Sequence, residues 1–198
     1  MSGKKPRPFR VVVTGGPCAG KTEIWRLLGE RFPEAVRVQE AASELILAGE
    51  TPDHLGQDEF QRRVYQRQIS LEKDAQKRGF FLICDRGVVD GLAYCPGILQ
   101  RLGVSLDAAM ARYALVLQLA VIPDPELYRT LCRNNPARHE DHPRALELEK
   151  ALRRIYSQHP AHHFLWGSKE GKLSAAVQFI LQRKKVEEPD LDFSPAEG

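Results

Sequence analysis

The sequence has few cysteines, and their spacing is not that of a metal site. The 198 residues include Cys18, Cys84, Cys95 and Cys132, with no C-x-x-C pair and no zinc-ligand spacing. The six histidines are scattered and give no metal pattern either. We therefore expect four free thiols in a reducing compartment, and a cytoplasmic protein.

Long apolar runs and a surplus of one charge are also absent. No stretch of ~18 apolar residues could span a membrane, and Met1–Arg10 lacks the apolar core of a signal peptide. The net charge is only +3, and basic runs occur only near the ends, at Lys4–Arg10 and Arg183–Lys185. Such runs are typical of solvated tails. The composition favours neither a membrane nor a nucleic-acid partner, and it leaves the oligomeric state open.

What the sequence does contain is a complete phosphate-binding motif. Gly15–Thr22 matches G-x-x-x-x-G-K-[ST], with a β-branched run before it and helical periodicity after it. Successive backbone N–H groups would form an anion nest at a helix N-terminus. Lys21, expected on an exposed loop, would bridge the β- and γ-phosphates, and the Thr22 hydroxyl would bind Mg²⁺.

This motif predicts ATP and Mg²⁺ as cofactors. The alternative is a glycine-rich turn that only caps a helix. The residues predicted to bind ATP here are Gly15, Gly16, Cys18, Ala19, Gly20, Lys21, Thr22 and Glu23.

Helix-like and strand-like segments alternate along the rest of the chain. The continuous apolar runs Phe80–Cys84 and Ala114–Ile122 are typical of strands buried on both faces of a parallel sheet. Further strands are expected at Arg10–Thr14, Val36–Gln39 and His163–Trp166. Helices are expected at Lys21–Phe32, Ala41–Ala48, Asp58–Lys77, Asp124–Cys132, Pro143–Gln158 and Lys169–Lys185.

This alternation predicts an α/β fold, a three-layer P-loop NTPase sandwich with five strands. We expect one domain over residues 10–186, a basic tail at 1–9, and an acidic, disordered tail at 187–198.

Polar residues follow the carboxyl ends of the predicted strands, where α/β sheets bind ligands. Asp85 is placed to bind Mg²⁺, and Arg86 to hold an acceptor or the transferring phosphoryl group. Alternatively, this pair caps the next helix. Glu40 could accept a proton from an acceptor hydroxyl or hydrogen-bond to it, or it could be an N-cap or first-turn carboxylate of the helix that follows. Asp90 and Tyr94 follow at helical spacing on the substrate side, unless they are surface or packing residues.

A polar segment lies between two predicted helices, near residues 129–142. It includes Arg129, Arg133, Arg138 and Glu140. We predict a lid that closes arginines over the phosphates, with Arg138 catalytic and Arg133 on ATP. The alternative is a solvated basic loop.

Together these pieces resemble the small P-loop kinase-like proteins known as AAA-domain ATP-binding proteins, related to ribosylnicotinamide kinase and deoxynucleoside kinases. The matching segments are Thr14–Thr22, Glu40–Ala42, Asp85–Gly87 with Asp90, and Arg138–Glu140. The resemblance implies a five-stranded parallel sheet in nucleoside-monophosphate-kinase order, with ATP and Mg²⁺. It also implies a glutamate near the acceptor, an Asp-Arg pair and a lid arginine, which match Glu40, Asp85, Arg86 and Arg138.

These features predict an ATP- and Mg²⁺-dependent kinase of a small, nucleoside-like or other hydroxyl- or phosphate-bearing metabolite. The predicted catalytic residues are Lys21, Glu40, Asp85, Arg86 and Arg138; Thr22 and Asp85 would hold the metal; Glu40, Arg86, Asp90 and Tyr94 would contact the substrate. Two alternatives stay open: a nucleotide switch or ATPase that acts through protein partners, and a nucleic-acid end kinase. A guanine-reading Asn-Lys-x-Asp motif is absent.

Overall fold

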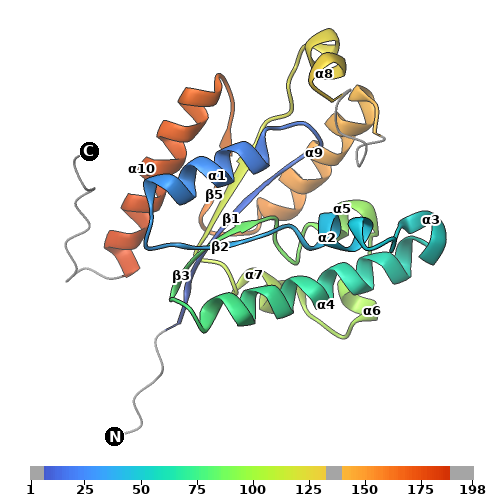
Figure 1. Cartoon of the computed structure of the whole chain (residues 1–198), viewed down its shortest axis with the longest axis horizontal. Helices are drawn as coiled ribbons and strands as arrows, with labels where there is room; N and C mark the ends of the chain where they lie inside the picture. Colours follow the sequence, from blue (N-terminus) through green and yellow to red (C-terminus); the bar gives the residue numbers. More distant parts are fainter. Residues whose placement is uncertain (1–6, 133–139, 188–198) are drawn as a thin grey trace, which may run out of the picture.

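A five-stranded parallel sheet runs through the centre of the protein (Figure 1). The computed structural model describes residues 7–132 and 140–187. The strand order is β2-β3-β1-β4-β5. The strands are β1 (Phe9–Gly15), β2 (Val36–Val38), β3 (Phe81–Asp85), β4 (Leu115–Leu119) and β5 (His162–Leu165). The predicted α/β fold is confirmed.

The sheet carries helices on both faces, as its apolar strands require. Every residue of β3 and β4 is buried. Val11 and Val13 of β1 belong to the core under α1 (Lys21–Arg31) and α10 (Lys169–Glu187). Val12, between them, faces the opposite core with residues of α9 (His142–Tyr156). Because neighbouring side chains of a strand point to opposite faces, one strand serves both cores and three layers result.

Further helices cover the second face and the sheet end (Figure 1). The longer ones are α4 (Gln57–Gln76), which packs on β2 and β3, and α8 (Pro125–Cys132). The short ones are α2 (Ala41–Leu47), α3 (Pro52–Leu55), α5 (Gly91–Tyr94), α6 (Ile98–Arg101) and α7 (Leu106–Met110). Of these short helices, only α2 was expected. Thr51 and Ser105 cap α3 and α7 through their hydroxyls, a signal that the sequence carried.

Two expectations about the chain as a whole stay predictions. Most of the tail expected at 187–198 and most of that at 1–9 lie outside the described residues, whereas Glu187 is the last residue of α10. Within the described part of the chain, none of the helices combines the length and the apolar character needed to cross a membrane. The cytoplasmic location is untested.

Candidate functional site

The phosphate loop, Gly15–Thr22, connects the carboxyl end of β1 to the N-terminus of α1. Its backbone turns through positive φ values at Gly15 (145°), Cys18 (56°) and Gly20 (83°). A Cβ on Gly16 would lie 2.6 Å from the Val121 side chain and 2.8 Å from the Ala145 carbonyl oxygen. Neighbouring elements therefore require a glycine at this position independently of any ligand.

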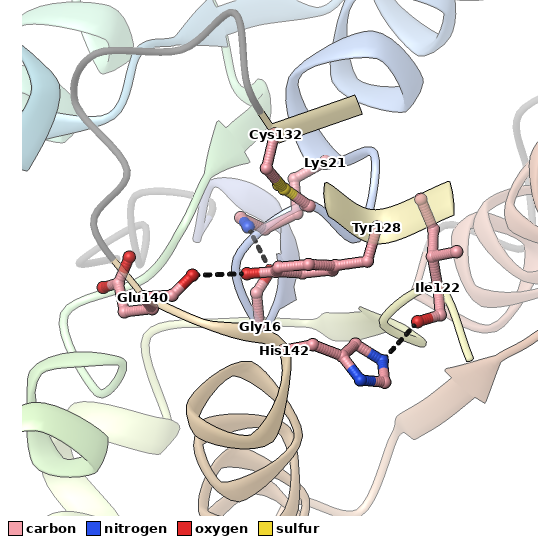
Figure 2. The surroundings of a disulfide bond; sticks show 8 residues. Gly16, Lys21, Ile122, Tyr128, Cys132, Glu140 and His142 are labelled. Carbon is pink, nitrogen blue, oxygen red and sulfur yellow. Dashed lines mark hydrogen bonds between the residues drawn. A yellow bond between two sulfur atoms is a disulfide. The ribbon is translucent and has the colours of Figure 1, made fainter. Parts of the chain in front are cut away.

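Lys21 is buried, contrary to the expectation of an exposed loop. It is the first residue of α1 and is only 2 % exposed. Its Nζ donates a hydrogen bond of 2.7 Å to the Gly16 carbonyl oxygen (Figure 2). This bond holds the ammonium group against the backbone of the phosphate loop, where it would contact a bound phosphate.

A disulfide joins the phosphate loop to the end of α8. It pairs Cys18 with Cys132, 114 residues further along the chain (Figure 2). The expectation of four free thiols was therefore wrong for these two, because the fold brings together cysteines that sequence spacing does not relate. Cys84 and Cys95 are free and buried.

Thr22 and Asp85 meet beside the loop. The Thr22 hydroxyl donates a hydrogen bond of 3.0 Å to Asp85 Oδ2, whereas Asp85 Oδ1 is buried without a hydrogen-bond partner. Burial, and then the negative charge of Glu40, raise the pKa of Asp85 to about 6.

This pair fits a magnesium ion. Mg²⁺ in kinases is held by one or two protein oxygens together with phosphate oxygens and waters. The described residues contain no cluster of three or more His, Cys, Asp or Glu side chains suited to a metal. The unpartnered Asp85 oxygen and the Thr22 hydroxyl are the donors that a nucleotide-bound Mg²⁺ would need.

Arg86 contacts the other three residues predicted on the substrate side. It has a positive φ of 72°, which is uncommon outside glycine and clusters at functional sites. Its guanidinium donates to Glu40 through Nε, to Asp90 through Nη1 at 3.2 Å, and to the Tyr94 hydroxyl through Nη2 at 3.3 Å. The structure thus brings together the four residues that we predicted on the substrate side.

Glu40 is held by two donors, since Arg86 contacts Oε1 and the Ser43 hydroxyl donates to Oε2 at 2.6 Å. Burial alone would raise its pKa, but the charges of Arg86 and Lys21 and these hydrogen bonds lower it to about 2. Such a carboxylate is always ionised near neutral pH and is a weak base. It is better suited to orienting groups than to removing protons.

Asp90 anchors Arg86 from the opposite side. It is 4 % exposed and accepts hydrogen bonds from Thr14 Oγ1 (2.7 Å) and from the Tyr156 hydroxyl, besides Arg86. Because these hydrogen bonds fix the Asp90 carboxylate, Asp90 positions Arg86. The sequence reasoning missed Thr14, Ser43 and Tyr156 as supporting residues.

A cavity of about 500 Å³, which we call the α4 cavity, opens beside these residues. Its wall includes Pro17 and Thr22 of the phosphate loop, Glu40, Arg86, and the inward face of α4. The α4 residues on it are Gln57, Phe60, Gln61, Val64, Tyr65 and Gln68. Sequence reasoning treated this helix as packing only. The signal was available, because Gln61 and Gln68 interrupt its apolar face at a seven-residue interval.

Of the remaining predicted residues, Glu23 and Arg129 are not brought into this arrangement. Glu23 is exposed and pairs with Arg26 at 3.2 Å, and Arg129 is exposed and pairs with Glu126. Glu140 lines the α4 cavity, and its backbone oxygen accepts from the Tyr128 hydroxyl at 3.0 Å (Figure 2). Arg133 and Arg138 lie outside the described residues.

Comparison with known proteins agrees with the fold. The family described as AAA domain matches residues 10–168. No curated protein matches the sequence. Among solved structures, thymidylate kinase from Ehrlichia chaffeensis superposes with a TM-score of 0.55 and 13 % identity, covering 89 % of this chain and 100 % of that chain. At that identity the likeness concerns the fold alone.

Proposed function

The chain belongs to the AAA domain family, and on that premise we propose that it is an ATP- and Mg²⁺-dependent kinase of a small, nucleoside-like metabolite. One observation carries the proposal. The α4 cavity shares Thr22 and Pro17 with the phosphate loop, and Glu40 and Arg86 lie on its wall. A molecule in this cavity would therefore approach the γ-phosphate of a nucleotide held by the loop.

The phosphate loop would bind ATP through its backbone N–H groups and Lys21. The positive end of the α1 dipole adds to this attraction. Thr22 and Asp85 would hold Mg²⁺, which neutralises charge on the phosphates when bound. Arg133 and Arg138 stay predictions for the lid.

In the proposed reaction, the acceptor hydroxyl oxygen forms a bond to the γ-phosphorus, and the bond from that phosphorus to the β,γ-bridging oxygen breaks. ADP leaves with that oxygen, and the hydroxyl proton goes to solvent. Arg86 stabilises the charge that spreads over the transferring group, while Glu40 orients Arg86 and accepts a hydrogen bond from the hydroxyl. The pKa of about 2 argues for this orienting role rather than for general-base catalysis.

Two other functions receive less support. A nucleotide switch does not require an acceptor-sized cavity next to its phosphate loop. A nucleic-acid end kinase needs a basic groove that leads to Glu40. Among the described residues on the wall of the α4 cavity, Arg86 is the sole basic side chain.

The test is ADP release with ATP and Mg²⁺ across a panel of nucleosides, nucleotides and vitamin precursors. A kinase shows turnover that one class of acceptor raises well above the water background. If no acceptor does so while ATP still binds, the switch is the better explanation.

A further inference from the structure

Helix α8 is attached to the phosphate loop by the Cys18–Cys132 disulfide and has little buried surface of its own. Of its eight residues, Tyr128 is buried and Cys132 is half-buried, whereas the others are exposed. The Tyr128 hydroxyl donates to the Glu140 backbone oxygen at 3.0 Å (Figure 2). A segment with so little buried surface opens locally at a low cost in free energy. The bridge therefore decides how firmly α8 stays on the phosphate loop.

The other end of the bridge lies in a buried stretch of the phosphate loop. Gly15–Ala19 and Lys21 are buried, with Cys18 only 7 % and Lys21 only 2 % exposed. The Lys21 ammonium donates to the Gly16 carbonyl oxygen at 2.7 Å. The phosphates of a nucleotide must contact Lys21 and the backbone N–H groups of the loop together, so the loop has to shift and uncover them. A covalent bond from Cys18 to α8 opposes that shift.

The bridge is also placed where it can be made and broken. Cys132 is half-buried at the end of α8 and is the more accessible of the two bridged residues. Cys84 and Cys95 are free and buried, so they are less accessible to a reagent than Cys132. Thiol–disulfide exchange requires access to one sulfur of the pair. Among the cysteines of the chain, the pair that touches the phosphate loop is therefore the one best placed for exchange.

We propose that Cys18 and Cys132 form a thiol–disulfide switch that controls nucleotide binding. The bridged form holds the phosphate loop closed to nucleotides, whereas the dithiol form releases the loop from α8 and binds them. The switch regulates the site of the proposed function. It rests on ATP binding by the loop and does not depend on the identity of the acceptor.

The bridge forms by exchange with a low-molecular-weight disulfide such as oxidised glutathione. The Cys132 thiolate attacks one sulfur of that disulfide, whose S–S bond breaks to release one small thiolate. The Cys18 thiolate then attacks the Cys132 sulfur, which forms the bridge and releases the second small thiolate. The two protein thiols are oxidised and their protons pass to the two small thiolates, while the small disulfide is reduced. An excess of the small thiol reverses both steps.

The first experiment compares nucleotide affinity in the two redox states. The full chain is oxidised with oxidised glutathione or reduced with a phosphine, and each sample is titrated with a fluorescent ATP analogue and Mg²⁺. Alkylation of the denatured samples should count two free thiols in the bridged form and four in the reduced form. We expect the reduced form to bind the analogue about tenfold more tightly, in the usual range for coupling between two sites. Reoxidation should restore the weaker binding.

The second experiment measures the same coupling from the opposite side. If the dithiol form binds the nucleotide better, a bound nucleotide must make the bridge easier to reduce by the same factor. In a glutathione redox titration, an analogue that saturates both forms should therefore raise the midpoint potential of the pair. A tenfold preference for the dithiol form corresponds to about 30 mV for this two-electron couple.

A variant pair separates the bridge from other effects of the reagents. Cys132→Ser cannot form the bridge, so after either treatment it should bind the analogue as the reduced wild type does. Cys95→Ser removes a free thiol and is the matched control, which should keep the tenfold difference. If Cys132→Ser does not fold, the two redox states of the wild type still decide the question.

The outcomes distinguish the switch from the function that it would regulate. Equal affinity in both states, with only a lower Tm after reduction, overturns the switch and leaves a bridge that stabilises the fold; the kinase is then unaffected. Tighter binding by the bridged form also overturns the switch. A redox-dependent affinity without acceptor-stimulated ADP release supports the switch and overturns the kinase. Binding by neither form overturns the switch together with the nucleotide site.

Discussion

The phosphate loop and the α4 cavity border each other at Thr22, but they are built in different ways. The loop is one continuous segment of eight residues whose backbone supplies the binding groups. Apart from Pro17 and Thr22, the wall of the cavity comes from segments within residues 40–68 and 86–98 and from Glu140, which only the fold brings together. We expect changes in the loop to affect any reaction of ATP, whereas changes in the cavity should affect only transfer to the acceptor.

Lys21→Ala should have the largest effect. Removing the ammonium at the mouth of the loop should lower ATP turnover by about 10³-fold, in the range for losing one electrostatic contact in a transition state. Because Lys21 is buried, the melting temperature must be recorded beside turnover. Lys73→Ala, on α4, is the control lysine. Unchanged turnover in a folded Lys21→Ala variant would remove the loop from the mechanism.

Cys132→Ser should come next, as a change that loosens the loop and leaves the cavity intact. The Cys18–Cys132 bridge closes a separation of 114 residues, and a native disulfide of this kind contributes about 3 kcal/mol to the free energy of unfolding. For a chain of this length that corresponds to a fall in Tm of about 10 °C. A thiol reductant should lower the Tm of the wild type but not of the variant. Equal sensitivity of both proteins to reductant would contradict the bridge.

Glu40→Gln tests the cavity side. The amide still hydrogen-bonds but loses the charge that orients Arg86, so acceptor-stimulated ADP release should fall by about 10²-fold. ATP binding should barely change, since the loop is intact. Its matched control, Glu44→Gln, lies one turn further along α2 and pairs at the surface with Arg67. If ATP affinity falls as much as turnover, the two regions are not separable in this way.

Asp85→Asn should give the smallest effect, and one that depends on pH. The pKa of Asp85 is raised to about 6 from its usual 3.8, so between these values the folded protein keeps a proton that the unfolded chain releases. Stability therefore falls as pH rises through this window, by on the order of 2 kcal/mol. The free energy of unfolding of the variant should lack this fall. Urea unfolding of both proteins at pH 4.5 and 7 measures it. If the free energy of unfolding changes equally with pH in both proteins, the raised pKa of Asp85 is contradicted.

The same variant also tests the metal. If Asp85 and Thr22 hold Mg²⁺, both Asp85→Asn and Thr22→Val should require more Mg²⁺ for half-maximal turnover. If turnover depends on Mg²⁺ concentration in both variants as it does in the wild type, neither residue lies near the ion.

The sequence by itself was enough to predict the phosphate loop and the five strands. The reason is that both are local: a strand buried on both faces needs a continuous apolar run, and an anion nest needs a fixed order of glycines and a lysine. The carboxyl ends of the strands then placed Glu40, Asp85 and Arg86 near the loop, because parallel strands end at one edge of the sheet.

What only the tertiary structure decided depends on contacts between distant segments. The pairing of Cys18 with Cys132 and the α4 wall of the cavity join segments that are far apart in the sequence, and the burial of Lys21 is likewise a property of the packed chain. The pKa values of Glu40 and Asp85 shift in opposite directions because burial and the negative charge of Glu40 raise that of Asp85, whereas the charges of Arg86 and Lys21 outweigh burial at Glu40. Periodicity and motif spacing describe each segment alone, whereas distance, burial and charge in a site depend on how the segments pack.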